Sequence, residues 1–329
     1  MNQIIGRKKE IKQLTEYYNS GKSEFVAVYG RRRIGKTYLV HNLFHNEFAF
    51  EMSGSIDAPS EAQLSNFGFA LREYGDTQQP IPATWTEAFE ALKQLLKAKL
   101  TSKRLVVFID ELPCLDTRKS GFQQAFEHFW NGWASKQNEI MLIVCGSATS
   151  WMINNLIDSH GGLHNRITHE IYLAPFTLGE TEEMLTSNGF TWSRLSILQI
   201  YSIMGGVPYY LSLLDKTQGV DANVDELFFS EHAELKREYG RLYTSLFKNS
   251  DIYMKVIEVL ASCKQGLTRK EIAEKIKLPS GGTLSKVIRE LVNCDFIRGY
   301  NTRDKKIKQK EQIYQLTDLY TLFYMQFCH

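Results

Sequence analysis

Phe25-Val26-Ala27-Val28-Tyr29-Gly30-Arg31-Arg32-Arg33-Ile34-Gly35-Lys36-Thr37 is the stretch of sequence that decides the fold. It begins with a continuous apolar run, as expected for a strand covered by helices on both faces. Gly30-x-x-x-x-Gly35-Lys36-Thr37 follows directly and opens a helical pattern, which is the context that a phosphate-binding loop requires. The glycines let the backbone wrap closely around phosphate, and the start of the helix presents the positive end of its dipole to the same anion. The sequence therefore predicts a phosphate-binding loop.

This loop predicts ATP and Mg²⁺ as ligands. Lys36 is expected to reach the β- and γ-phosphates, and Thr37 to place its hydroxyl on Mg²⁺. The residues that we assign to nucleotide binding here are Gly30, Arg33, Ile34, Gly35, Lys36, Thr37 and Tyr38. The arginines of the loop could pair with phosphate or with an acidic partner, or could be solvated, and none is given a catalytic role.

A second apolar run, Leu105 to Ile109, ends in the acidic pair Asp110-Glu111. This order places carboxylates at the carboxyl end of a central strand, where open α/β sheets bind their ligands. We expect Asp110 to hold Mg²⁺ and Glu111 to act as general base on the attacking water. The alternative is that the pair only caps the following helix.

Further apolar runs indicate the remaining strands of an α/β fold. They lie at residues 48–52 and 140–144, with a weaker candidate at 170–173. Helix-length segments separate them, at 60–73, 84–100 and 122–135. Strand and helix in alternation predict a doubly wound parallel sheet, which we assign to a nucleotide-binding core of residues 1–175.

After Pro175 the periodicity is helical alone, which predicts an all-α lid over 176–248. Its expected helices are 177–188, 192–204, 208–216 and 223–247. Residues 249–316 then give helices at 252–262, 268–276 and 280–292 and a basic hairpin at 296–316, the order of a winged helix-turn-helix. Residues 317–329 resemble the start of a further C-terminal domain, so that either the protein lacks this domain or the sequence is truncated.

Composition limits the class of protein. The chain has 329 residues, of which 43% are hydrophobic and 23% charged, and a net charge of +2, as in an ordinary globular protein with two or three domains. We find no signal peptide and no apolar run near the ~20 residues that cross a bilayer. The five cysteines are scattered without metal-ligand spacing, which favours reduced thiols in a cytoplasmic protein.

Several motifs together resemble a known family. The phosphate loop is preceded by Ile5-Gly6-Arg7 and followed by Asp110-Glu111-Leu112-Pro113, Cys145-Gly146-Ser147, Arg166 before Ala174-Pro175-Phe176, and Gly205-Gly206-Val207-Pro208. In this order they resemble the archaeal-type ATPases of the STAND group, relatives of the AAA+ ATPases and of the origin-binding Orc/Cdc6 proteins. The resemblance covers essentially residues 1–325.

The resemblance implies further site residues. Gly6 and Arg7 correspond to an N-terminal box beside the adenine and phosphates, and Ser147 to a polar sensor of the γ-phosphate. Arg166 corresponds to the arginine that stabilises charge on the γ-phosphate, in cis or from a neighbouring subunit. Pro208 corresponds to a lid proline on the adenine or ribose. Each residue also has a structural alternative: a charged first helix turn for Gly6-Arg7, a helix cap for Ser147, a surface ion pair for Arg166 and a helix start for Pro208.

The C-terminal third predicts either DNA contact or docking within the protein. In the expected recognition helix Lys286 and Arg289 face outward, and the wing at 298–310 holds six basic residues against one acid, Asp304. Such a cluster predicts salt-dependent binding to double-stranded DNA. The helix carries no strong base-reading signature, and winged helices in STAND proteins often dock on their own nucleotide domain.

Three functions follow from these features. The first is a slow ATPase that acts as a switch, in which nucleotide state changes how the winged helix docks and binds DNA or protein. The second is a DNA-binding initiator or regulator in which ATP is mainly structural. The third is a protein-interaction scaffold of a defence or toxin-antitoxin type, with nucleotide-dependent homo-oligomerisation.

Overall fold

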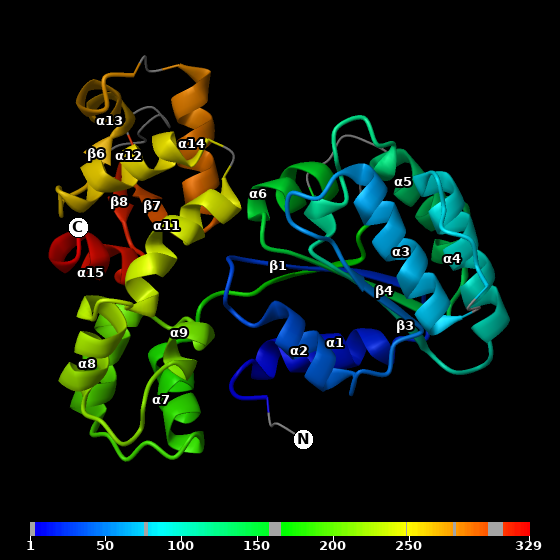
Figure 1. Cartoon of the computed structure of the whole chain (residues 1–329), viewed down its shortest axis with the longest axis horizontal. Coiled ribbons are helices and arrows are strands. Elements are labelled where there is room, and N and C mark those ends of the chain that lie inside the picture. The colour runs from blue at the N-terminus through cyan, green and yellow to red at the C-terminus, as the bar shows by residue number, and fades with distance from the viewer. Residues whose placement is uncertain (1–3, 76–77, 158–165, 248, 279–280, 302–311) are drawn as a thin grey trace. The chain divides into compact units, whose positions relative to one another are not determined.

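A computed structural model describes residues 4–75, 78–157, 166–247, 249–278, 281–301 and 312–329. Their contacts divide the chain into two compact units, shown in Figure 1. The first consists of Met1–Gly30 and Lys36–Leu173, and the second of Arg31–Gly35 and Ala174–His329. The middle of the predicted phosphate loop thus packs with the second unit, while both of its ends belong to the first.

A parallel sheet forms the centre of the first unit. Its strands are β1 (Glu24–Tyr29), β2 (Phe50–Ser53), β3 (Leu105–Asp110), β4 (Ile140–Gly146) and β5 (His169–Tyr172). They lie in the order β2-β3-β4-β1-β5 and every pair is parallel. This confirms the predicted α/β fold, with strands within two residues of the predicted runs. Because the strands are parallel, the carboxyl ends of β1, β3 and β4 meet at one edge.

Helices cover both faces of this sheet. The helices of the first unit are α1 (Lys8–Tyr18), α2 (Lys36–Leu43), α3 (Ser60–Tyr74), α4 (Trp85–Lys99), α5 (Phe122–Gly132) and the short α6 (Thr149–Met152). Figure 1 shows α3, α4 and α5 on one face and α1 and α2 on the other. Alternate strand residues such as Phe25, Val107 and Leu142 join α3–α5 in one apolar core. Their neighbours Val26, Phe108 and Ile143 are buried on the opposite face, which explains why these runs are apolar throughout.

The second unit is mainly helical. Its first helices are α7 (Leu178–Ser187), α8 (Arg194–Met204), α9 (Pro208–Ser212), α10 (Val220–Val224), a π-helix (Asp225–Phe229) and α11 (Glu234–Leu246). They continue with α12 (Ser250–Ala261), α13 (Arg269–Lys275), α14 (Gly282–Asn293) and α15 (Leu319–Phe327). One apolar core runs from Phe176 to Tyr320 and includes residues from most of these helices.

An antiparallel sheet of three short strands completes the second unit. β6 (Leu267–Thr268), β7 (Ile297–Tyr300) and β8 (Ile313–Leu316) lie in the order β6-β8-β7. On α14 the expected apolar face is buried, and Lys286 and Arg289 are exposed. The tip of the predicted wing, 302–311, lies outside the described residues, and the interpretation as a winged helix-turn-helix stays a prediction.

The predicted single helix 223–247 is wrong. α10 continues directly into the π-helix, and Ser230, in an extended conformation, and Ala233, which is also non-helical, separate the π-helix from α11. The additional residue in the π-helical turn shifts the periodicity, so that Leu227 and Phe228 are both buried. Phe228 then packs against Phe323 of α15, with ring centroids 4.9 Å apart.

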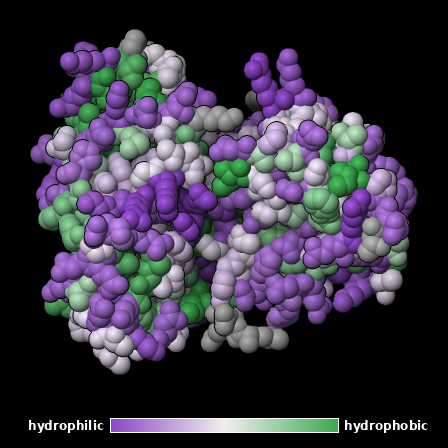
Figure 2. Space-filling model, viewed as in Figure 1, coloured by the Kyte–Doolittle hydropathy of each residue, from purple (hydrophilic) through white to green (hydrophobic). Residues whose placement is uncertain are grey.

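Figure 2 shows hydrophilic side chains over most of the visible face, with hydrophobic ones in small groups. In the part of the chain that the structure describes, no helix combines the length and apolar character needed to span a bilayer. All five cysteines are among the described residues, and no disulfide joins them.

Candidate nucleotide site

The phosphate loop connects β1 to α2. Gly30, Arg33 and Gly35 have positive φ angles of 144°, 72° and 85°. Residues in the left-handed region that alternate with right-handed neighbours turn successive backbone N–H groups toward one concave side, which suits an anion. Lys36 is buried at 6% exposure and donates a hydrogen bond from Nζ to the Gly30 carbonyl oxygen at 3.0 Å. The lysine side chain therefore lies back along the loop.

Asp110 and Thr37 meet at the carboxyl edge of the sheet. Thr37 Oγ1 donates to Asp110 Oδ2 at 2.6 Å, and the Glu111 N–H donates to Asp110 Oδ1 at 2.9 Å. Burial raises the pKa of the Asp110 carboxyl, and the hydrogen bond from Thr37 only partly offsets this. A hydroxyl beside a buried carboxylate is a set of hard oxygen ligands, so these two residues fit a Mg²⁺ ion.

Glu111 is held by Ser147, which follows β4. The Ser147 hydroxyl donates to Glu111 Oε2 at 2.9 Å, and the Ser147 N–H donates to the same oxygen at 3.1 Å. Glu111 makes no side-chain capping hydrogen bond to the short helix Leu112–Cys114, and the N-cap residue of α6 is Ala148 rather than Ser147. Glu111 and Ser147 thus bind each other, and the roles assigned to them at the nucleotide stay predictions.

Gly146 allows the end of β4 to lie close to the turn that follows Glu111. A Cβ at Gly146 would lie 2.8 Å from both the Met152 sulfur and the Pro113 Cδ. Only a residue without a side chain lets the end of β4 come this close to the turn after Glu111. Gly146 therefore brings Ser147 and Glu111 into hydrogen-bonding distance.

The N-terminal box and the loop flanks differ in burial. Gly6 and Arg7 have positive φ angles of 63° and 54° directly before α1, and Arg7 is 5% exposed. Ile34 is buried, whereas Tyr38 on α2 is 45% exposed. Arg7 stands at the N-cap of α1, so both the predicted nucleotide contact and the alternative of a charged first helix turn stay open.

Arg166 is not brought to these residues. It is exposed, in a turn before β5, and directly follows the segment 158–165 outside the description. No hydrogen bond or ion pair joins its side chain to any described residue. Neither its predicted role at the γ-phosphate nor the alternative surface ion pair has a contact to support it.

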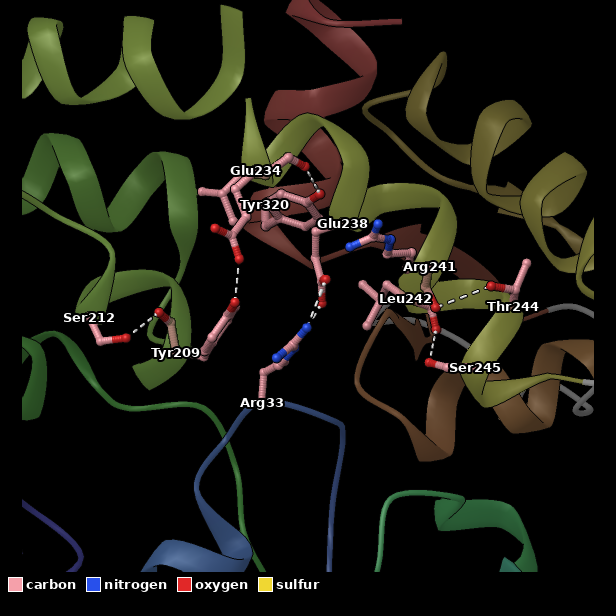
Figure 3. Close-up of polar contacts among 11 residues, drawn as sticks. Arg33, Tyr209, Ser212, Glu234, Glu238, Arg241, Leu242, Thr244, Ser245 and Tyr320 are labelled. Carbon is pink, nitrogen blue, oxygen red and sulfur yellow. Dashed lines mark hydrogen bonds and ion pairs between the residues drawn. The ribbon is translucent and has the colours of Figure 1, made fainter. Parts of the chain in front are cut away.

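Arg33 of the phosphate loop binds residues of the second unit (Figure 3). Arg33 donates from Nε and Nη2 to the two carboxylate oxygens of Glu238 on α11, at 3.1 Å each. Its guanidinium lies over the Tyr209 ring, 3.9 Å from the centroid. Pro208 is in the first turn of α9, so it does begin a helix, and the next residue, Tyr209, donates its N–H to the Arg33 carbonyl oxygen at 3.3 Å.

Arg31 is the functional candidate that sequence reasoning missed. Its side chain is 1% exposed and forms a hydrogen-bonded ion pair with Asp318, whose side chain is 5% exposed. The arginine triplet was a visible signal that a loop residue needs an anionic partner. No local pattern indicates a partner 287 positions along the chain.

A phosphate loop after β1, a carboxylate at the end of β3 and a hydroxyl after β4 define a P-loop nucleotide-binding protein. Residues 4–214 match the family described as an ATPase domain predominantly from Archaea. This match covers more than half of the 329 residues, and the chain belongs to that family. It is an ATPase that binds nucleotide, which confirms the resemblance to archaeal-type P-loop ATPases.

Relatives agree with this assignment. The uncharacterised protein MJECL04 of Methanocaldococcus jannaschii is 25% identical over 325 residues, covering 98% of this chain and 68% of that protein. The Walker-type ATPase PABY2304 of Pyrococcus abyssi is similar in structure, with a TM-score of 0.71 and 15% identity over 98% of this chain and 96% of that one. The ORC2 protein of Aeropyrum pernix, solved as ADPNP-ADP complexes, gives a TM-score of 0.59 and 14% identity over 98% and 94%. The two structural likenesses concern the fold.

Proposed function

We propose that this ATPase hydrolyses ATP slowly with Mg²⁺ and acts as a switch, in which the bound nucleotide governs the conformation of the second unit. The observation that carries the proposal is the pair of contacts at the sheet edge, Thr37 to Asp110 and Ser147 to Glu111. They supply a metal-binding pair and a positioned carboxylate beside a phosphate loop.

Each residue has a role in hydrolysis. The N–H groups of the loop and the start of α2 bind the phosphates, and Lys36 neutralises charge on them. Thr37 and Asp110 are the groups that would hold Mg²⁺, which supplies charge neutralisation for the β- and γ-phosphates. Glu111 orients the attacking water and accepts its proton.

Ser147 sets the resting state of the base. Its N–H and hydroxyl both bind Glu111 Oε2, so Oε1 is the oxygen left to receive the water unless Ser147 moves. A γ-phosphate that competes for the Ser147 hydroxyl would release Glu111. Slow turnover suits a switch, because a slowly hydrolysed nucleotide reports a state.

The roles of the residues assigned to the adenine, the ribose and the charge of the γ-phosphate are proposals that rest on the family resemblance. Gly6, Arg7, Tyr38 and Pro208 would lie beside the adenine or ribose, and Arg166 would stabilise charge on the γ-phosphate in cis or from a neighbouring subunit. We place the protein in the cytoplasm. Nucleotide-dependent homo-oligomerisation would be detected by sedimentation in the presence of ATP or ADP.

Phosphate release tests the catalytic assignment. Lys36→Ala should abolish nucleotide binding and hydrolysis together. Glu111→Gln should keep ATP affinity and lower the single-turnover rate by about 10²–10⁴-fold, because only the general base is lost. Unchanged hydrolysis by Glu111→Gln would remove Glu111 from the mechanism, and unchanged binding by Lys36→Ala would refute the site as a whole.

A second candidate function is binding to double-stranded DNA. It is favoured by the exposed side chains of Lys286 and Arg289 on α14, although Lys286 also lies 4.0 Å from Glu290. Replacing both by Gln should weaken binding uniformly across sequences and reduce the slope of log affinity against log salt by about two. Lys255→Gln on α12 is the matched control. Absence of duplex binding at low salt, with ATP and with ADP, would leave protein docking as the output.

A further inference from the structure

Two carboxylates of the second unit hold two of the three arginines of the phosphate loop. Asp318 at the start of α15 binds Arg31, and Glu238 in the middle of α11 binds Arg33. Both pairs lie inside the second unit, to which Arg31–Gly35 belongs by its contacts. The backbone that should cradle phosphate is therefore fixed by residues from the last third of the chain.

The Arg31 pair is deeply buried. The guanidinium also lies 4.8 Å from the centroid of the Phe296 ring. Burial acts to lower the pKa of Arg31, but the charge and hydrogen bond of Asp318 together with the nearby Tyr210 and Tyr243 outweigh this effect, and the pKa is raised. Removing one member of such a pair leaves the other charge buried and uncompensated, which is strongly unfavourable. Arg31 is consequently a firm attachment point for the loop.

Asp318 connects this attachment to α15. Its Oδ1 accepts from Arg31, while its Oδ2 accepts from the Thr321 N–H at 3.0 Å and from the Thr321 hydroxyl at 2.6 Å. The second set of bonds caps the N-terminus of α15. One carboxylate thus fixes both a phosphate-loop residue and the first turn of a helix.

The Arg33 pair fixes an uncommon backbone conformation. A non-glycine residue with a φ of 72° is sparsely populated and persists only when its surroundings hold it. Three contacts do so: the two-pronged bond to Glu238, the Tyr209 ring and the hydrogen bond from the Tyr209 N–H. The left-handed residue is one of those that turn the loop N–H groups to one side.

We infer that Asp318 and Glu238 are positioning residues of the nucleotide site, which set ATP affinity by holding Arg31 and Arg33 and hence the backbone of Arg31–Gly35. The inference rests on the proposal that this loop binds ATP. Neither carboxylate needs to touch the nucleotide. By thermodynamic reciprocity, a nucleotide that favours the anchored loop also favours the capped start of α15.

The test compares nucleotide affinity in variants that remove charge but keep shape. Asp318→Asn retains an oxygen for the cap of α15, and Glu238→Gln retains the length of the side chain. Glu290→Gln is the matched control, because Glu290 is a buried carboxylate of α14 in the same unit that accepts from the Tyr253 hydroxyl. Titration uses a fluorescent ATP analogue with Mg²⁺, and melting curves establish that each variant is folded.

Asp318→Asn and Glu238→Gln should raise the Kd of the analogue at least about fivefold, whereas Glu290→Gln should leave it within about twofold of wild type. The kcat at saturating ATP should change much less than KM, since no reacting group is altered. Arg33→Gln added to Glu238→Gln should cause little further loss, and Arg33→Lys should retain part of the affinity.

Equal affinities in all variants, or tighter binding once a pair is broken, would overturn the inference. If Asp318→Asn does not fold, Glu238→Gln with the Arg33 cycle decides alone. Failure of the proposed function would give a different result. The wild-type protein itself would then bind no nucleotide, or would bind it no more tightly than Lys36→Ala does.

Discussion

At the scale of single residues, the site contains a buried carboxylate whose charge does not favour folding. Asp110 is a carboxylate at 7% exposure whose raised pKa shows that its charged form is disfavoured by burial. Its adjacency to Thr37 could be predicted, because both follow strands whose carboxyl ends share an edge. The hydrogen bonds from Ser147 to Glu111 could not, since they depend on the close approach that Gly146 permits.

Asp110→Asn should stabilise the nucleotide-free protein while it impairs function. The amide can still accept from the Glu111 N–H and can donate to Thr37 Oγ1, so only the buried charge is lost. We expect calorimetry at neutral pH to give an equal or higher melting temperature for Asp110→Asn. The free energy of unfolding should rise by about 1 kcal/mol or less. The Mg²⁺-dependent part of the nucleotide affinity should be lost.

The pH dependence of this difference has a definite sign. Because the folded pKa of Asp110 lies above its ordinary value of 3.8, the cost of the ionised group is complete above the folded pKa. It disappears as pH falls through that pKa toward 3.8. The advantage of Asp110→Asn should shrink over the same window. A variant that is less stable than wild type at neutral pH without nucleotide would contradict this account.

At the scale of elements, pattern predicts the regular parts and fails where a tertiary contact decides. β1, β3 and β4 follow continuous apolar runs, and the helix expected at 268–276 is present as α13, which begins with a capping box of Thr268 and Glu271. β6 has two residues, too few to carry a pattern. The break between α10 and α11 could not be read from periodicity, because it depends on Phe228 packing against α15. The partners of Arg31 and Arg33 were beyond local sequence for the same reason.

Two glycines should respond in opposite directions to the same substitution. A Cβ at Gly206 would lie 1.8 Å from the Phe176 carbonyl oxygen, whereas nothing lies within 4 Å of one at Gly240 on the exposed side of α11. Gly206→Ala should destabilise by about 1–3 kcal/mol through overpacking. Gly240→Ala should stabilise by about 0.5–1 kcal/mol, because alanine favours a helix interior. Urea denaturation measures both, and equal effects would mean that the close approach at Gly206 is not tightly packed.

At the scale of the whole molecule, the chain enters the second unit twice, first for Arg31–Gly35 and again from Ala174 onward. The family match at 4–214 includes the phosphate loop but ends before Glu238 and Asp318. The two carboxylates that pair with Arg31 and Arg33 therefore lie outside the part of the chain that matches the family, whereas Tyr209 lies inside it. Our proposal of a switch, in which the C-terminal helices respond to nucleotide, rests on this connectivity.

Hydrogen–deuterium exchange tests this central claim most directly. It should be measured on Glu111→Gln, which retains ATP, with Mg²⁺-ATP, with Mg²⁺-ADP and without nucleotide. We predict that ATP slows amide exchange in α11 and α15 by about fivefold or more relative to ADP, and that Lys36→Ala shows no difference. Identical exchange in these helices under all three conditions, with nucleotide demonstrably bound, would contradict the account.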